Sequence, residues 1–194
     1  MQGRDGETGL GRDAEGALWV FGYGSLIWNP GFPFLARRPA RLRGYARSFC
    51  LSSIRYRGTP EAPGLVLALA AAEGAGVECR GLAYKIAPEA ADDAHAYLRH
   101  REMVTDSYLE TEQDLEVDGL GPIRALTYVI DHDHPQHLKL SPDEQAAIIA
   151  RAVGPAGSNR DYLHNTVAHL RELGLPDPEL EALDLKVRAL AGQG

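Results

Sequence analysis

Short runs of apolar residues, separated by turn residues, occupy the first two thirds of the chain. The first run, residues 18–21, leads directly into Gly22-Tyr23-Gly24-Ser25, a pattern that predicts a buried strand ending in a tight glycine turn. Residues 88–102 are predicted to form a helix, because their apolar residues recur at the spacing of one helical face. The other runs with the length of a strand are residues 46–52, 64–70, 81–86 and 123–130.

After His137 the pattern changes, and it predicts helices only. Ser141-Pro142-Asp143-Glu144 combines a capping serine, a proline at the first helical position and a glutamate at the third, so it marks a helix start. That helix is expected to end at Gly154-Pro155. Two further helices are expected, from Ser158 to Gly174 and from Asp177-Pro178 towards Leu190.

These elements predict one mixed α+β domain over residues 18–194, with mainly antiparallel strands and a helical C-terminal tail. The first 17 residues mix glycine with charged residues. They are expected to form a disordered leader, because they offer too little apolar surface to offset the entropy of ordering. They also lack the apolar stretch of a signal peptide.

Composition narrows the class of protein. The 194 residues are 44% hydrophobic and carry a formal net charge of -7, which argues against sequence-independent nucleic-acid binding, since that needs a basic face. No stretch approaches the roughly 20 apolar residues that span a bilayer. Cys50 and Cys79 have neither CxxC spacing nor enough partners for a disulfide framework. The expected protein is therefore cytoplasmic, with no membrane and no nucleic acid among its partners.

The glycine turn is the first candidate for chemistry. Glycines after a strand free consecutive backbone N–H groups, which can hold an anion or a developing oxyanion. No Gly-Lys-Ser/Thr follows Gly22-Tyr23-Gly24-Ser25-Leu26, so the segment is not a phosphate-binding P-loop. Taken alone, it is equally consistent with an ordinary turn between a strand and a loop.

Glu102 is the second candidate. On the predicted helix it falls at the border of the arc that contains Ala91 and Leu98. A carboxyl group partly shielded there would have a raised pKa, which suits a general base that works near neutrality. The alternative is a solvated helical glutamate.

Two other segments carry polar residues that could bind ligands. His132, His134 and His137 stand in a short loop, where either a metal or solvent could face them; no second cluster with the spacing of zinc ligands is evident. Arg55 and Arg57 follow a predicted strand among hydroxyl residues and could receive a carboxylate, or could lie on an exposed turn.

Five segments together resemble the ChaC-like family of γ-glutamylcyclotransferases, enzymes that act on glutathione. They occur in the family's order and cover nearly everything from residue 18 to about 184. One departure is Ser107, which stands before Tyr108 where many members have glycine. The matching segments are WVFGYGSLIW at 19–28, RGTPEAPG at 57–64, YLRHREM at 97–103 with the later Tyr108, ALTYV at 125–129 and GPAGSNRDYL at 154–163.

The resemblance implies a barrel-like mixed α/β fold, a catalytic acid/base at Glu102, and no cofactor or metal. It implies glutathione as the small-molecule substrate, cyclised within its own γ-glutamyl group to 5-oxoproline with release of Cys-Gly. Two other interpretations stay open: a cyclotransferase for other γ-glutamyl amino acids or amines, and a non-enzymatic regulator of cation transport. The implied substrate-binding residues are Val20, Phe21, Gly22, Tyr23, Gly24, Ser25, Leu26, Arg57 and Tyr108.

Overall fold

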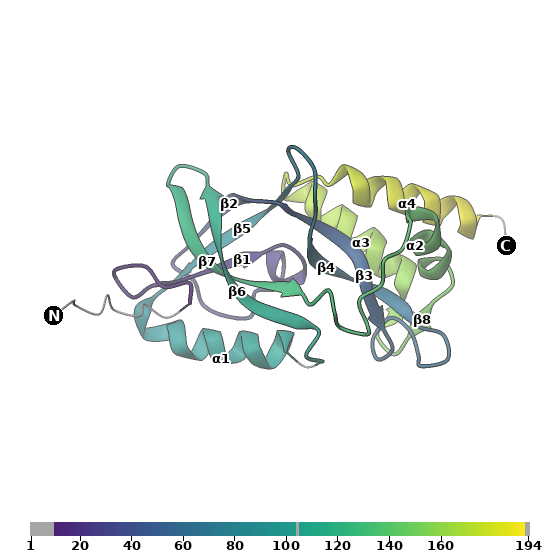
Figure 1. Cartoon of the computed structure of the whole chain (residues 1–194), viewed down its shortest axis with the longest axis horizontal. Coiled ribbons are helices and arrows are strands. Elements are labelled where there is room, and N and C mark those ends of the chain that lie inside the picture. Colours follow the sequence, from purple (N-terminus) through teal and green to yellow (C-terminus); the bar gives the residue numbers. More distant parts are fainter. Residues whose placement is uncertain (1–9, 104, 193–194) are drawn as a thin grey trace. The chain divides into compact units, whose positions relative to one another are not determined.

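The computed structural model describes residues 10–103 and 105–192. The chain divides into two compact units, each built from two separate stretches: Met1–Gly44 with Glu78–Val129, and Tyr45–Val77 with Ile130–Gly194. The elements (Figure 1) are β1 (Leu18–Gly22), η1 (Ser25–Ile27), β2 (Ala36–Arg43), β3 (Tyr45–Ser53), β4 (Gly64–Ala71), β5 (Glu78–Ile86), η2 (Pro88–Ala90), α1 (Ala91–Glu102), β6 (Tyr108–Val117), β7 (Gly121–Ile130), α2 (Pro142–Ile149), β8 (Val153–Gly154), β9 (Gly157–Ser158), α3 (Asn159–Glu172) and α4 (Pro178–Ala191).

The first unit is a closed five-stranded barrel in the order β1-β5-β2-β6-β7. β5 pairs with β1 and with β2, both antiparallel, and β2 also pairs with β6. The barrel closes through a parallel contact between Val20 of β1 and Leu126 of β7. All five residues of β1 are buried, as its continuous apolar run predicts.

Helix α1 lies along the outside of the barrel, against β6. Ala91, Ala94 and Leu98 form its buried face. On a neighbouring face, His95 and Arg99 contact Glu110 of β6, at 2.8 and 3.0 Å. The buried apolar face packs α1 onto the barrel, and Glu102 is the last residue of the helix.

The second unit combines the β3–β4 hairpin with helices α2, α3 and α4. Asn159, the first residue of α3, is fully buried and ties the helix to β4: its side chain accepts from the Leu65 N–H at 2.6 Å and donates to the Leu65 carbonyl at 2.7 Å. Arg47 of β3, whose side chain is 2% exposed, forms an ion pair with Asp177, the cap of α4. The unit is therefore held by polar ties as well as by its apolar core.

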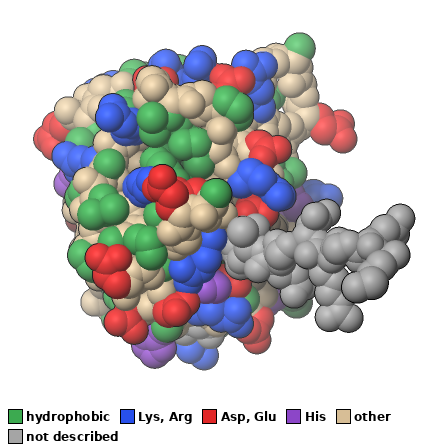
Figure 2. Space-filling view, turned by 90° about the vertical axis from the view of Figure 1, so that its left-hand side faces the viewer, with side chains coloured by type: hydrophobic (Ala, Val, Ile, Leu, Met, Phe, Trp, Pro, Cys, Tyr) green, Lys and Arg blue, Asp and Glu red, His purple; other side chains and the backbone are tan. Residues whose placement is uncertain are grey.

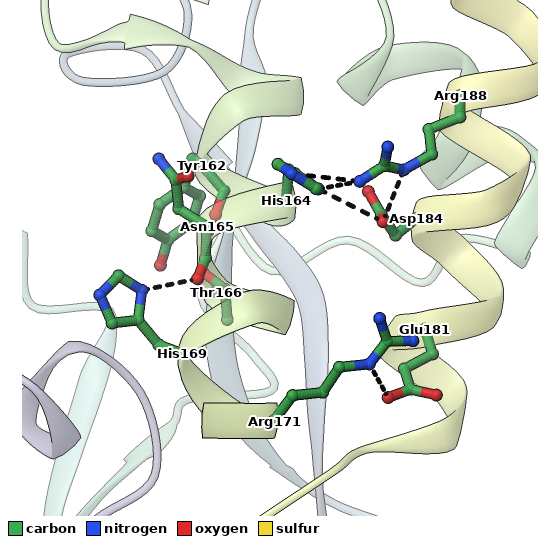
Figure 3. Close-up of polar contacts among 9 residues, drawn as sticks. All are labelled: Tyr162, His164, Asn165, Thr166, His169, Arg171, Glu181, Asp184 and Arg188. Atoms are coloured by element: carbon green, nitrogen blue, oxygen red, sulfur yellow. Dashed lines mark hydrogen bonds and ion pairs between the residues drawn. The ribbon is translucent and has the colours of Figure 1, made fainter. Parts of the chain in front are cut away.

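Helices α3 and α4 are linked by polar contacts along their length (Figure 3). Arg188 of α4 contacts the imidazole of His164 of α3, and Arg171 of α3 binds Glu181 of α4 at 2.7 Å; within α4, Arg188 also binds Asp184 at 2.9 Å. Their apolar sides are buried at Leu163, Val167 and Leu170 of α3 and at Leu180, Leu183 and Val187 of α4.

The structure confirms most of the predicted elements and adds several. The strands predicted from apolar runs are β1, β3, β4, β5 and β7, and the capping box of Ser141 and Glu144 starts α2 as expected. The sequence pattern did not reveal β2 or β6. The expectation of helices only after His137 is wrong at β8 and β9, because Gly157, with φ of 101°, allows a tight hairpin.

The segment expected to be a disordered leader contains a turn. Within residues 10–17, the Gly11 N–H donates to Glu112 at 2.8 Å, and Asp13 accepts from the N–H groups of Glu15 and Ala17. Residues 1–9 lie outside the described residues. The prediction of one domain over residues 18–194 stays a prediction.

Candidate active site

The glycine turn follows β1 and continues into the short helix η1. Packing favours glycine at position 22, since a Cβ atom there would lie 3.1 Å from the Tyr84 ring and 3.2 Å from Leu26 Cβ, both tight contacts. The Tyr84 hydroxyl donates to the carbonyls of Leu26 and Ile27, at 2.9 and 3.1 Å. The backbone of the turn is therefore held by a fully buried tyrosine of β5.

Glu102 lies at the C-terminal end of α1, and its side chain is 18% exposed. Burial raises the pKa of Glu102, and the neighbouring Arg101 cation opposes that rise. The helical spacing predicted this partial shielding, which is confirmed. A carboxyl group with a raised pKa can accept a proton and give it back near neutrality.

Arg101 connects this end of the helix to the glycine turn. Its Nη2 atom donates to Ser25 Oγ at 2.8 Å, and its Nη1 atom donates to the Asn29 carbonyl at 2.7 Å. Its Nε atom lies 3.3 Å from Glu102 Oε1. The turn and the acid, predicted separately from the sequence, thus share one arginine.

Two tyrosines, Tyr23 and Tyr128, interact electrostatically with the acid, and a third, Tyr108, is hydrogen-bonded to Tyr23. Tyr23 and Tyr108 form a side-chain hydrogen bond; burial raises the pKa of Tyr23 well above its ordinary value, and Tyr108 and Glu102 raise it further. Tyr128 of β7 also interacts electrostatically with Glu102, and burial raises its pKa strongly. Phenols with such pKa values stay protonated and act as hydrogen-bond donors; the Tyr128 hydroxyl donates to Glu110.

Tyr128 and its partner Glu110 are residues that the sequence pattern did not single out. The Tyr128 hydroxyl donates to Glu110 Oε1 at 2.8 Å, and Glu110 also binds His95 and Arg99. These contacts hold the pKa of Glu110 below its ordinary value, although burial acts in the opposite direction. Glu110 is therefore an anionic anchor beside the site. The sequence pattern gave no signal for Glu110, because it did not reveal β6.

The other predicted binding residues fall into two groups. The side chains of Val20 and Phe21 are almost fully buried in β1, so only their backbone could face a ligand. Arg57 belongs to the second unit, where Nη1 donates to the Ala156 carbonyl at 2.6 Å and the guanidinium lies 4.9 Å from the centre of the Tyr162 ring. Carboxylate binding by Arg57 or Arg55 stays a prediction.

The histidine loop is bound into the second unit. The rings of His132 and His137 meet edge to face at 4.7 Å, His134 Nδ1 accepts from the Gln136 N–H, and Gln136 hydrogen-bonds the backbone of Ser52. Among residues 10–103 and 105–192, no group of three or more His, Cys, Asp or Glu side chains is arranged to hold a metal ion. The loop contacts therefore have a structural explanation.

The second unit also has a surface cavity of about 500 Å³. It is lined by residues of α2, α3 and α4 together with Arg151, and none of the predicted site residues is among them. The lining contains two arginines, Arg151 and Arg160, but no carboxylate or histidine. It therefore lacks a group that could act as a general base near neutrality.

The distribution of charge on the surface agrees with the net charge of -7, which argued against a basic face. On the face shown in Figure 2, basic and acidic side chains are intermixed and do not form one large basic field. In the described part of the chain, no helix has both the length and the apolar character needed to cross a membrane.

Comparison with known proteins identifies the family. The family model described as ChaC-like protein matches residues 18–190. The chain is 36% identical to the glutathione-specific gamma-glutamylcyclotransferase of Escherichia coli K12 over 94% of this chain and 78% of that relative. It is 38% identical to gamma-glutamylcyclotransferase 2-3 of Arabidopsis thaliana over 91% of this chain and 92% of that relative.

A solved structure confirms the fold. The crystal structure of the γ-glutamyl cyclotransferase specific to glutathione from yeast superimposes with a TM-score of 0.76 at 28% identity, covering 90% of this chain and 99% of the other. In a non-enzymatic protein, the ion pair between Arg101 and Glu102 could serve structure alone. The relatives from E. coli and Arabidopsis, however, are named as enzymes. The chain belongs to the ChaC-like protein family and is an enzyme of the γ-glutamylcyclotransferase type.

Proposed function

We propose that this chain is a glutathione-specific γ-glutamylcyclotransferase, which converts glutathione into 5-oxoproline and Cys-Gly. The relatives from E. coli and yeast carry this specificity in their names. The observation that carries the proposal is the meeting of one shielded carboxyl group, Glu102, with the glycine turn through Arg101.

The nucleophile of this reaction is part of the substrate. The α-amine of the γ-glutamyl residue attacks the carbon of its own side-chain amide, so a nitrogen–carbon bond forms and the bond from that carbon to the cysteine nitrogen breaks. The amine starts as an ammonium and loses two protons, and the cysteine nitrogen gains two and leaves as an ammonium. Neither an external nucleophile nor an oxidant is consumed.

Glu102 is proposed to carry the protons between the two nitrogens. As a carboxylate it takes a proton from the substrate ammonium, which makes the amine nucleophilic, and it then protonates the leaving nitrogen. Its raised pKa supports this exchange, since a carboxylate of ordinary pKa is a weaker base and would take the proton from the ammonium less readily. General acid–base catalysis of this kind contributes about 10²- to 10⁴-fold to the rate.

The glycine turn is proposed to bind the γ-glutamyl group and to stabilise the tetrahedral intermediate. Backbone N–H groups around Gly24, Ser25 and Leu26 would donate to the oxyanion, which forms at the amide carbon when the amine attacks. The Tyr23 phenol, which its raised pKa keeps protonated, is a further donor near Glu102. Holding amine and carbonyl together can contribute on the order of 7–11 kcal/mol in well-aligned cases.

Glu102→Gln tests the proposal, with Glu89→Gln as the matched control. Glu89 is an exposed residue of η2, at the other end of the same helical segment, so its substitution makes the same chemical change away from the site. Release of 5-oxoproline and Cys-Gly from glutathione is measured by chromatography. We expect Glu102→Gln to lower kcat by about 10²- to 10⁴-fold and Glu89→Gln to leave it unchanged.

Two results would contradict the proposal. If Glu102→Gln kept a kcat close to that of the wild type, the acid–base role would be wrong. If the wild type released 5-oxoproline from γ-glutamyl-alanine as efficiently as from glutathione, judged by kcat/KM, the specificity would be wrong while the reaction class would stand.

A further inference from the structure

The contacts of Arg101 distinguish it from Arg99, the other arginine of α1. Its guanidinium donates to Ser25 Oγ and to the Asn29 carbonyl, both in the segment that follows β1, and to the Tyr97 hydroxyl one helical turn earlier, at 3.1 Å. The same group lies 3.3 Å from Glu102 Oε1. Its side chain is only 20% exposed.

A guanidinium suits this arrangement because its five N–H donors have a fixed planar geometry. Ser25 and Arg101 are 76 residues apart in the chain. Because the planar group has partners both on the turn and on its own helix, it holds the turn and the end of the helix in a fixed position relative to each other. A lysine has a single nitrogen on a flexible stem, so it could not meet the same acceptors together.

We propose that Arg101 is a positioning residue, which fixes the orientation of the Glu102 carboxyl group relative to the glycine turn. The inference rests on the proposed function and adds a residue to it. Arg101 acts through Glu102 and Ser25 and need not touch the substrate. Cyclisation depends on alignment of the amine, the amide carbon and the acid, and an error of about 1 Å in such an alignment can lower the rate by about 10²-fold.

The charges around Glu102 give a second readout. The groups that interact electrostatically with Glu102 are Arg101 on its own helix, Tyr23 after β1 and Tyr128 on β7. Of these, only Arg101 is cationic, and it lowers the pKa that burial raises. Removing the cation therefore raises the pKa of Glu102 further, and the acidic limb of the pH–kcat/KM profile moves to higher pH.

Arg99→Met is the matched control for Arg101→Met. Arg99 is on the same helix, carries the same charge and also forms an ion pair, but its partner is Glu110 and not Glu102. We expect Arg101→Met to lower kcat by about 10²-fold and to move the acidic limb upward, while Arg99→Met does neither. Arg101→Lys keeps the cation, so we expect it to lower kcat with little movement of the limb.

Thermal unfolding shows whether each variant folds, and Arg101→Lys alone decides the question if Arg101→Met does not. The proposal is overturned if Arg101→Lys keeps the wild-type kcat, or if a folded Arg101→Met matches Arg99→Met in kcat and in its acidic limb. Carboxyl titration by ¹³C NMR gives the pKa of Glu102 without turnover. Absence of 5-oxoproline from the wild type would overturn the proposed function, whereas an unchanged Glu102 titration in Arg101→Met would overturn the positioning role.

Discussion

The Tyr84 hydroxyl holds the glycine turn through hydrogen bonds, and Tyr84→Phe removes them while keeping the aromatic ring. Its hydroxyl donates to the carbonyls of Leu26 and Ile27, and its ring is fully buried. The ring also packs edge-on against Phe32 and Phe34, with centroids 5.6 and 5.2 Å away. Phenylalanine keeps these ring contacts, so the substitution removes the donor to the backbone carbonyls together with the hydrogen bond to Arg37.

The size of the effect follows from the cost of unpaired polar groups. Leaving a buried acceptor without its partner costs about 1–3 kcal/mol. For a chain of this length, 1 kcal/mol lowers Tm by roughly 2–4 °C. We therefore expect Tyr84→Phe to lower Tm by about 2–12 °C. Because the freed turn carries the proposed oxyanion donors, we also expect kcat to fall by up to about 10²-fold.

Calorimetry and 5-oxoproline release measure the two effects, with Tyr45→Phe as the control. Tyr45 is a half-buried residue at the start of β3, in the other unit, so it tests the loss of a phenol hydroxyl elsewhere. If Tyr84→Phe matched Tyr45→Phe in both Tm and kcat, the hydroxyl would not support the turn and the reasoning would be refuted.

Two further predictions concern stability. Because burial raises the pKa of Glu102, the native state keeps a proton that the unfolded state has lost, so the stability of the wild type falls as pH rises from the ordinary pKa of 4.5 through the raised folded value. The difference between the Tm of Glu102→Gln and the Tm of the wild type should therefore grow with pH. A difference that stays flat or shrinks between pH 4 and 8 would contradict this reasoning. Asn159→Ala removes the hydrogen-bond partners of both the N–H and the carbonyl of Leu65, which should lower the free energy of unfolding by about 2 kcal/mol or more. Urea denaturation measures this loss. A loss similar to that of Asn165→Ala at an exposed position would show that these hydrogen bonds do not stabilise the unit.

Local signals predicted the elements whose cause is local. The apolar run of β1 and the capping box of Ser141 and Glu144 need no distant partner, and both are where the pattern indicated. β2 was not predicted, because it carries four arginines and Pro39, and only Ala40 and Leu42 are buried. β6 was missed for a similar reason, since its buried residues are Leu115 and Val117 alone. A barrel strand with a polar exterior has too weak an apolar pattern to be predicted from its own sequence, because its pairing with neighbouring strands defines it.

The candidate site was predictable only in part. Helical spacing predicted the partial shielding of Glu102, and glycine spacing predicted the turn. Their convergence depends on how the buried face of α1 (Ala91, Ala94 and Leu98) packs on the barrel, which involves residues distant in the chain. The resemblance to a family supplied that relation before any geometry was known. Arg101 stood beside Glu102 in the sequence, but nothing in the spacing revealed that it would reach Ser25.

The order in which the barrel strands are synthesised has a consequence for biogenesis. β1 is apolar throughout, and its two pairing partners, β5 and β7, are encoded 60 or more residues later. A nascent chain released before β5 would expose an unpaired apolar edge, which is the kind of surface that aggregates or recruits chaperones. Truncated transcripts of this gene should therefore yield insoluble product, and efficient production should depend on the ribosome reaching the end of the message.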